Sequence, residues 1–190
     1  MSYTFSRRDF MKYSAVAAVA VAGSSMFTGC STSNPNRPYG TYTKDAKCSL
    51  SFGGTADAQT LLAGATYDSG TKTLVLPFEH YAVSQGCSCT AANYQIDITA
   101  ADGKIKSYRN GSDFGDTTIT KVSITDNGGA AGMTVETTYS PKITVTGIDF
   151  TGAKKVEVRY FPRHNALGKE NDTYSDVYAT WNITSLFPTA

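Results

Sequence analysis

The sequence predicts an all-β protein, specifically a single antiparallel β-sandwich of about ten strands with immunoglobulin-like or related Greek-key topology. From about residue 47 onward, apolar and polar residues alternate with period two in short runs. Gly, Asp, Asn and Pro separate these runs at intervals of roughly 8 to 12 residues, which is typical of sandwiches. No long window repeats apolar residues at helical spacing, and the best helical candidate, residues 56–63, is short.

The clearest strand predictions rest on alternation that gives each segment one apolar face. In residues 94–98, Tyr94, Ile96 and Ile98 share a face. In residues 177–183, Trp181 is in phase with other apolar residues and is expected to be buried. Further strands are expected at residues 48–52, 61–67, 72–81, 104–109, 117–125, 133–139, 143–150 and 156–161.

Two local features refine this prediction. Asp102-Gly103 stands between two alternating runs and predicts a hairpin with a type I′ turn, because this turn needs positive φ angles that Asp and Gly tolerate. In residues 143–150 the apolar phase slips by one residue at Gly147, which predicts a β-bulge there.

The N-terminal segment carries export signals. Residues 6–12, which include Arg7 and Arg8, resemble the twin-arginine export motif and precede an apolar stretch at residues 15–27. Phe27-Thr28-Gly29-Cys30 resembles a lipobox, in which the cysteine thiol accepts a diacylglycerol before cleavage. The resemblance implies a lipoprotein anchored through Cys30 on the extracytoplasmic side of a bacterial cell envelope.

These signals divide the chain into three parts. Residues 1–29 are expected to be the signal peptide, residues 30–46 the lipid anchor and tether, and residues 47–190 the sandwich domain. Residues 31–40 are polar and contain two prolines, which suits a tether. The whole chain has a formal net charge of +1, and this near neutrality argues against a nucleic-acid partner.

Three cysteines remain once Cys30 is assigned to the lipid. Outside the cytoplasm, Cys48 is expected to form a disulfide with Cys87 or Cys89, because that compartment is oxidising. The alternative is a metal site, in which these three thiols and His80 bind zinc or copper.

Two weaker candidate sites lie near the C-terminus. Glu170, Asp172 and Asp176 supply oxygen ligands of the kind that calcium prefers, although they do not match a twelve-residue calcium loop. Tyrosine is frequent, with 12 in the chain, and Tyr174 and Tyr178 flank this acidic segment as candidates for a ligand surface.

No recognised catalytic or nucleotide-binding motif occurs in the sequence, so a non-enzymatic role is the first hypothesis and no resident cofactor is expected. The leading hypothesis is an envelope-anchored binding or adhesion module for a carbohydrate, a peptide or an envelope protein. One alternative is a metal-binding or redox protein that uses the cysteines and His80, and another is a structural accessory protein of the envelope.

Overall fold

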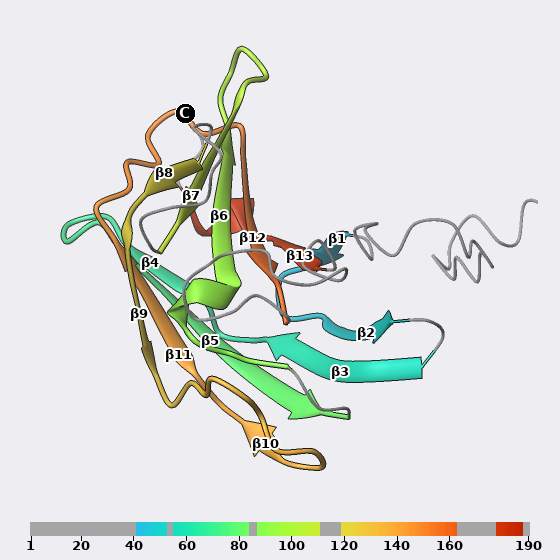
Figure 1. Cartoon of the computed structure of the whole chain (residues 1–190). Coiled ribbons are helices and arrows are strands. Elements are labelled where there is room, and N and C mark those ends of the chain that lie inside the picture. The colour runs from blue at the N-terminus through green and yellow to red at the C-terminus, as the bar shows by residue number, and fades with distance from the viewer. Residues whose placement is uncertain (1–40, 53–54, 84–86, 111–118, 163–177, 188–190) are drawn as a thin grey trace, which may run out of the picture. The chain divides into compact units, whose positions relative to one another are not determined.

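The computed structural model describes residues 41–52, 55–83, 87–110, 119–162 and 178–187. The chain divides into two compact units, residues 1–32 and 33–190, and every described residue belongs to the second. The described part contains thirteen strands and two 3₁₀ helices (Figure 1). The strands form two sheets, which confirms the predicted all-β sandwich.

The first sheet has six strands in the order β1-β13-β12-β6-β7-β8. Its three central pairings are antiparallel, whereas β1 pairs with β13 and β7 pairs with β8 in parallel. The sequence predicted only antiparallel pairing, and the two parallel pairs at the edges correct that expectation. The strands are β1 (Thr41–Thr43), β6 (Tyr94–Thr99), β7 (Ile105–Arg109), β8 (Ile119–Lys121), β12 (Lys155–Tyr160) and β13 (Ala179–Asn182).

The second sheet has seven strands, and five of them follow the order β2-β3-β5-β11-β9. The short strands β4 and β10 both pair with β5, which is the longest strand and crosses the middle of this sheet. The strands are β2 (Lys47–Phe52), β3 (Thr55–Leu62), β4 (Thr66–Asp68), β5 (Thr73–Ala82), β9 (Ser123–Asn127), β10 (Thr138–Tyr139) and β11 (Lys142–Thr146).

The core between the sheets comes from the alternation seen in the sequence. Leu74, Leu76 and Phe78 of β5 are buried, as are Ile96 of β6 and Trp181 of β13. Trp181 is fully buried, which confirms its predicted place, and its Nε1 donates a hydrogen bond to the carbonyl oxygen of Ala46 at 2.8 Å. This bond joins the final strand to the loop before β2.

The β6–β7 connection is a hairpin, as predicted, but its turn differs from type I′. Only Gly103 has a positive φ, at 83°, and its amide donates a hydrogen bond to the carbonyl oxygen of Ala100. The amide of Ala100 in turn bonds to the carbonyl oxygen of Lys104. This is the three-residue loop in which a type I turn is followed by one left-handed glycine.

Three further expectations from the sequence are also corrected. The bulge expected at Gly147 is absent, because β11 ends at Thr146 and Gly147 has a φ of 83° in the following turn. The candidate helix at residues 56–63 lies largely within strand β3. The tether was expected to extend to residue 46, but Thr41–Thr43 forms strand β1 in register with β13.

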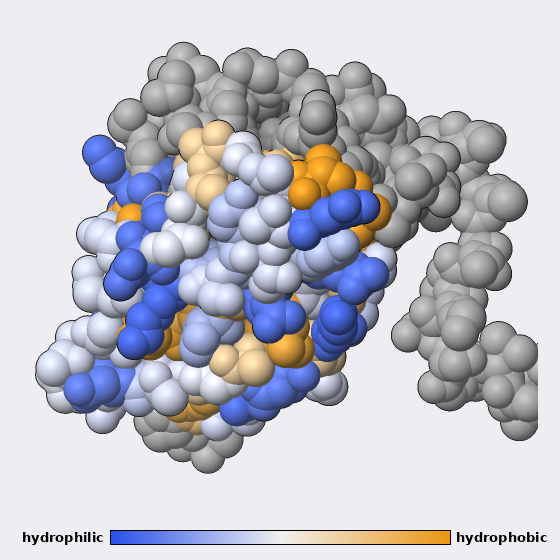
Figure 2. All heavy atoms as spheres, turned by 90° about the horizontal axis from the view of Figure 1, so that it is seen from below, coloured by the Kyte–Doolittle hydropathy of each residue, from blue (hydrophilic) through white to orange (hydrophobic). Residues whose placement is uncertain are grey.

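Two surface properties accompany this architecture. None of the described residues belongs to a helix long and apolar enough to span a bilayer. Figure 2 views the end of the domain away from the β6–β7 hairpin, where hydrophilic residues predominate and apolar ones form only small separate groups.

Candidate functional site

The candidate site is the outer face of the six-stranded sheet. In β6, Tyr94, Ile96 and Ile98 point into the core, so Gln95 and Asp97 lie on the opposite face. Outer faces of antiparallel sheets usually carry solvated polar residues. Here, however, four outward side chains of three adjacent strands are buried, since Gln95, Asp97, Arg109 and Glu157 are at most 8 % exposed. The side chain of Arg159 on the same face is 24 % exposed and is therefore within reach of solvent.

Strand register sets these side chains in two rows. Glu157 of β12 lies opposite Asp97 of β6, which in turn lies opposite Ser107 of β7. The next row contains Arg159, Gln95 and Arg109 on the same three strands. We call these six residues the polar face.

Asp97 is the centre of the polar face. Its Oδ1 accepts hydrogen bonds from Gln95 Nε2 and Ser107 Oγ, both at 2.7 Å. Its Oδ2 forms an ion pair with Arg159 Nη2 at 2.6 Å. The neighbouring Glu157 pairs separately with Lys155 Nζ at 2.7 Å. Each carboxylate therefore has its own cation, which compensates the repulsion between like charges on directly paired strands.

Aromatic rings hold both arginines of the polar face. Arg159 stacks over Tyr178, with its guanidinium carbon 4.9 Å from the ring centroid, and its Nη1 donates to Tyr178 Oη at 3.3 Å. Arg109 stacks over Phe161 at 4.8 Å. The two rings also contact each other, with centroids 4.9 Å apart. These contacts fix the planes of the guanidinium groups.

The arrangement suits recognition of a polar ligand. Arg159 Nε is buried and makes no hydrogen bond with any residue in the described part of the chain. A buried donor without a partner is uncommon in folded proteins and often marks the place of a water molecule or another bound group. A fixed guanidinium beside an amide, a carboxylate and a tyrosine hydroxyl offers both donors and acceptors on one surface.

The predicted cysteine site lies in the core instead. Cys48, Cys87 and Cys89 are buried, and no disulfide joins them in the structure, so the predicted disulfide is absent from it. Cys48 Sγ forms a 2.9 Å hydrogen bond with Thr60 Oγ1 of the neighbouring strand β3. Burial raises the pKa of the Cys48 and Cys89 thiols to about 11. Both thiols are therefore protonated at neutral pH and pack as small apolar groups.

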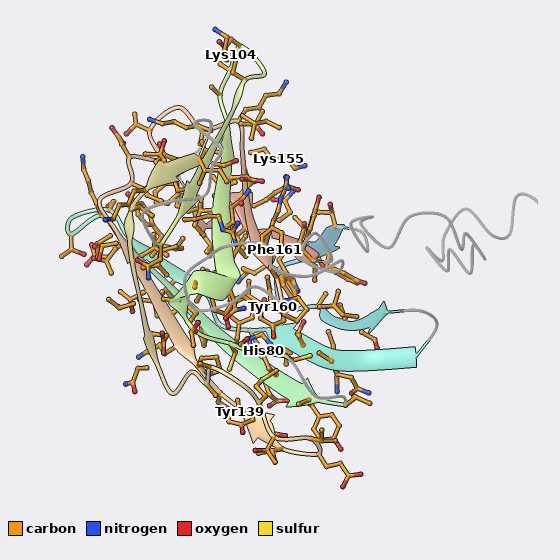
Figure 3. All side chains as sticks on the ribbon, viewed as in Figure 1. His80, Lys104, Tyr139, Lys155, Tyr160 and Phe161 are labelled. Carbon is orange, nitrogen blue, oxygen red and sulfur yellow. The ribbon has the colours of Figure 1, made fainter. Side chains whose placement is uncertain are left out.

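His80 also lies in the core. Its ring stacks on Tyr160 with centroids 4.2 Å apart, and its Nε2 is 2.7 Å from Tyr94 Oη (Figure 3). Among the described residues, which include His80 and all three thiols, no three His, Cys, Asp or Glu side chains are placed to hold a metal ion. The alternative zinc or copper site at Cys48, Cys87, Cys89 and His80 gains no support from this geometry. Cys48 and His80 point into the core from strands β2 and β5, whereas Cys87 and Cys89 are buried in the segment between β5 and the 3₁₀ helix at residues 91–93.

Several predicted residues lie outside the described part of the chain. They are Arg7, Arg8, Cys30, Glu170, Asp172, Tyr174 and Asp176. Tyr178 is described, and its ring lies against the guanidinium of Arg159; its place in a ligand surface stays a prediction.

Sequence reasoning missed the polar face itself. Its residues were read as the solvent side of ordinary strands. The signal was the presence of charged residues at consecutive outward positions of one strand, Glu157 and Arg159, and at Asp97 of another. Only the register could show that these three residues are neighbours.

Comparisons with known proteins agree with the export signal. Residues 4–24 match the family described as the TAT (twin-arginine translocation) pathway signal sequence. Together with the two sheets, this match defines the chain as an exported protein of the all-β sandwich class. No curated protein matches the chain.

One solved structure is similar to the chain. It is MPT63, a secreted protein from Mycobacterium tuberculosis, with 13 % sequence identity. The alignment covers 75 % of this chain and 95 % of that one, with a TM-score of 0.41. The functional argument below therefore rests on the geometry of this chain.

Proposed function

We propose that this protein is a non-catalytic binding module, anchored by lipid at Cys30 on the extracytoplasmic side of the envelope, that recognises a carbohydrate or peptide ligand. The observation that carries the proposal is the polar face, where Arg159 is held by Asp97 and Tyr178 while its Nε finds no partner among the described residues. The buried acid–base pair is weak evidence for stability, since such pairs often contribute little net free energy. A recognition role accounts better for the exact orientation of its donors.

The lipid anchor is supported by the sequence order of the export signal and the cysteine. The twin-arginine match ends at residue 24, and Cys30 directly follows the small residues Thr28 and Gly29. Two or three acyl chains anchor a protein firmly, whereas a single chain binds a membrane only weakly. Intact-mass measurement of protein extracted from membranes tests this point. The expected species begins at Cys30 and carries added acyl mass, and an unmodified Cys30 would exclude the anchor.

A binding assay tests the role of the polar face. Cell-wall polysaccharide and peptidoglycan from the producing bacterium are immobilised, and retention of the wild-type protein is compared with that of a double variant, Asp97→Asn with Arg159→Gln. This variant removes both charges together, so neither is left buried without its partner. Lys142→Gln is the matched control, because Lys142 is exposed on the other sheet.

The expected result is that the wild type and Lys142→Gln are retained while the double variant is lost, with circular dichroism confirming that all three are folded. Equal retention of the double variant would refute the polar face as the binding site. Absence of retention for the wild type on these polymers and on an array of short peptides would favour a structural accessory protein instead.

A further inference from the structure

The β6–β7 hairpin presents an apolar side chain at a projecting tip. Ile105 is 61 % exposed and is the one large apolar side chain classed as exposed among the described residues. Lysines flank it on both sides, and the side chain of Lys104 is 86 % exposed. Figure 3 places Lys104 at the outermost point of this hairpin. An isoleucine exposed at a hairpin tip together with several lysines suits the boundary of an anionic bilayer, where apolar and basic side chains both bind.

The sheet register brings more lysines to the same end. Lys155 lies opposite Thr99, which lies opposite Ile105, and the amide of Lys154 bonds to the carbonyl oxygen of Thr99. We call this group the hairpin patch, and it consists of Lys104, Ile105, Lys106, Lys154 and Lys155.

The hairpin patch has an excess of positive charge. Lys104 pairs with Asp102 at 3.1 Å, and Lys155 pairs with Glu157 at 2.7 Å. Within the described part of the chain, Lys106 and Lys154 form no ion pair. Lys106 instead lies over the ring of Tyr108, with Nζ 5.2 Å from the centroid. Two lysine charges therefore remain uncompensated at this end of the sheet, with Lys106 on the opposite face of β7 from Ile105.

We propose that the hairpin patch is a membrane-contact surface, in which the lysines approach anionic phospholipid headgroups and Ile105 enters the interfacial region. Apolar side chains combined with basic residues bind this region through both burial and electrostatic attraction. Each lysine near an anionic surface strengthens partitioning by roughly five-fold. The contact would orient the domain on the bilayer, so that it does not tumble freely on its tether.

This inference rests on the proposed lipid anchor for the proximity of the bilayer. Ten residues, 31–40, separate Cys30 from β1 in the sequence, and a flexible chain of that length would have an average end-to-end distance of about 17 Å. A domain held so close to a bilayer experiences a high effective concentration of headgroups. A patch that binds weakly in free solution is then occupied for much of the time.

The test places a fluorescent reporter at the hairpin. The protein contains a single tryptophan, Trp181, which is fully buried. The variant Ile105→Trp adds a second one at the patch, and Thr125→Trp is the matched control on an exposed position of β9 in the other sheet. Each full-length protein is extracted from membranes and mixed with vesicles that contain brominated lipid, made either of phosphatidylcholine alone or of equal parts phosphatidylcholine and phosphatidylglycerol.

Bromine quenches only tryptophan at the membrane. The expected result is at least about two-fold stronger quenching of Ile105→Trp in the anionic vesicles than in the neutral ones, reversed by high salt, with little quenching of Thr125→Trp in either. Adding Lys104→Glu and Lys106→Glu to Ile105→Trp should weaken the contact by about 25-fold or more, since two lysines at roughly five-fold each are lost.

The two proposals fail in distinguishable ways. Flotation with neutral vesicles reports the lipid anchor, because the patch has little affinity for them; loss of flotation there would exclude the anchor. Quenching that is equal in neutral and anionic vesicles, or equal for Ile105→Trp and Thr125→Trp, would overturn the hairpin patch as a membrane contact. Quenching that persists after both lysines are replaced by glutamate would overturn the electrostatic part of the proposal.

Discussion

Acidification should destabilise the protein through His80, whose ring is fully buried among aromatic side chains. Phe78 and Tyr160 stack on the imidazole, with centroids 5.2 and 4.2 Å away, and Nδ1 has no hydrogen-bond partner. Burial lowers the pKa of His80 from 6.5 to about 3, because a charged ring is poorly solvated there. The folded protein therefore resists a protonation that the unfolded chain accepts.

This difference in pKa sets the direction and the size of the change in stability. The contribution of His80 to stability is fully present above pH 6.5 and is lost progressively as the pH falls toward the folded-state pKa of about 3. Within that window the free energy of unfolding falls by about 1.4 kcal/mol per pH unit. Between about pH 7.5 and about pH 4.5, the expected loss is about 2.5 kcal/mol.

The protonation of four surface carboxylates changes little in this pH range. Asp45, Asp68, Asp102 and Asp149 have pKa values below their ordinary 3.8, mainly because each accepts backbone hydrogen bonds. Their contributions are lost only under more acidic conditions. Between about pH 7.5 and about pH 4.5, the change in the free energy of unfolding therefore reports on His80 and not on these four carboxylates.

Urea unfolding followed by Trp181 fluorescence measures the effect. All proteins carry His164→Gln, which removes the second of the two histidines. The midpoint of this reference protein should fall by roughly 1 to 2 M across the interval, given ordinary urea m-values. His80→Phe should flatten the pH dependence, although it costs stability at every pH because Tyr94 Oη loses its partner.

Tyr94→Phe is the matched control for that cost. It removes the same hydrogen bond but leaves the buried imidazole, so its pH dependence should remain close to that of the reference protein. A reference protein with a constant midpoint between about pH 7.5 and about pH 4.5 would refute the reasoning. The same conclusion would follow if His80→Phe kept the full pH dependence.

Four further changes test other parts of the structure. Trp181→Ala should cost about 3 to 5 kcal/mol in urea unfolding, because the indole is fully buried; a nearly unchanged midpoint would contradict this. Arg159→Ala should cost about 3 to 5 kcal/mol by leaving Asp97 buried without its cation, and adding Asp97→Asn should restore part of the loss. Gly103→Ala should lower the free energy of unfolding by about 1 to 2 kcal/mol, because a φ of 83° is strained for a residue with a Cβ. A Cβ there would meet no other atom, so no steric clash adds to this cost. An unchanged melting temperature would argue against the observed turn. In Cys30→Ser protein, thiol titration after denaturation without reductant should find three free thiols, and a count of one would show that two of them pair after export.

Local sequence signals determined the fold class and the route out of the cytoplasm. Alternation in residues 94–98 and 177–183 placed Ile96 and Trp181 in the core, because successive strand residues point to opposite faces. The twin-arginine signal could be identified because an export signal is a continuous sequence motif. None of these inferences requires knowledge of which strands are neighbours.

Strand order and register decided which distant residues are neighbours and which side chains are buried or exposed. Asp97 and Arg159 are 62 positions apart in a sequence that gives no sign of their pairing, and only the β6–β12 register makes them partners. The disulfide was predicted from the chemistry of the compartment, yet tertiary packing buries all three cysteines in the core without joining them. Ile105 looked like an ordinary strand residue, and its exposure depends on its place at the end of the sheet. Sequence alone specifies short-range geometry well, whereas a site built by several strands depends on contacts between distant residues, which no local pattern encodes.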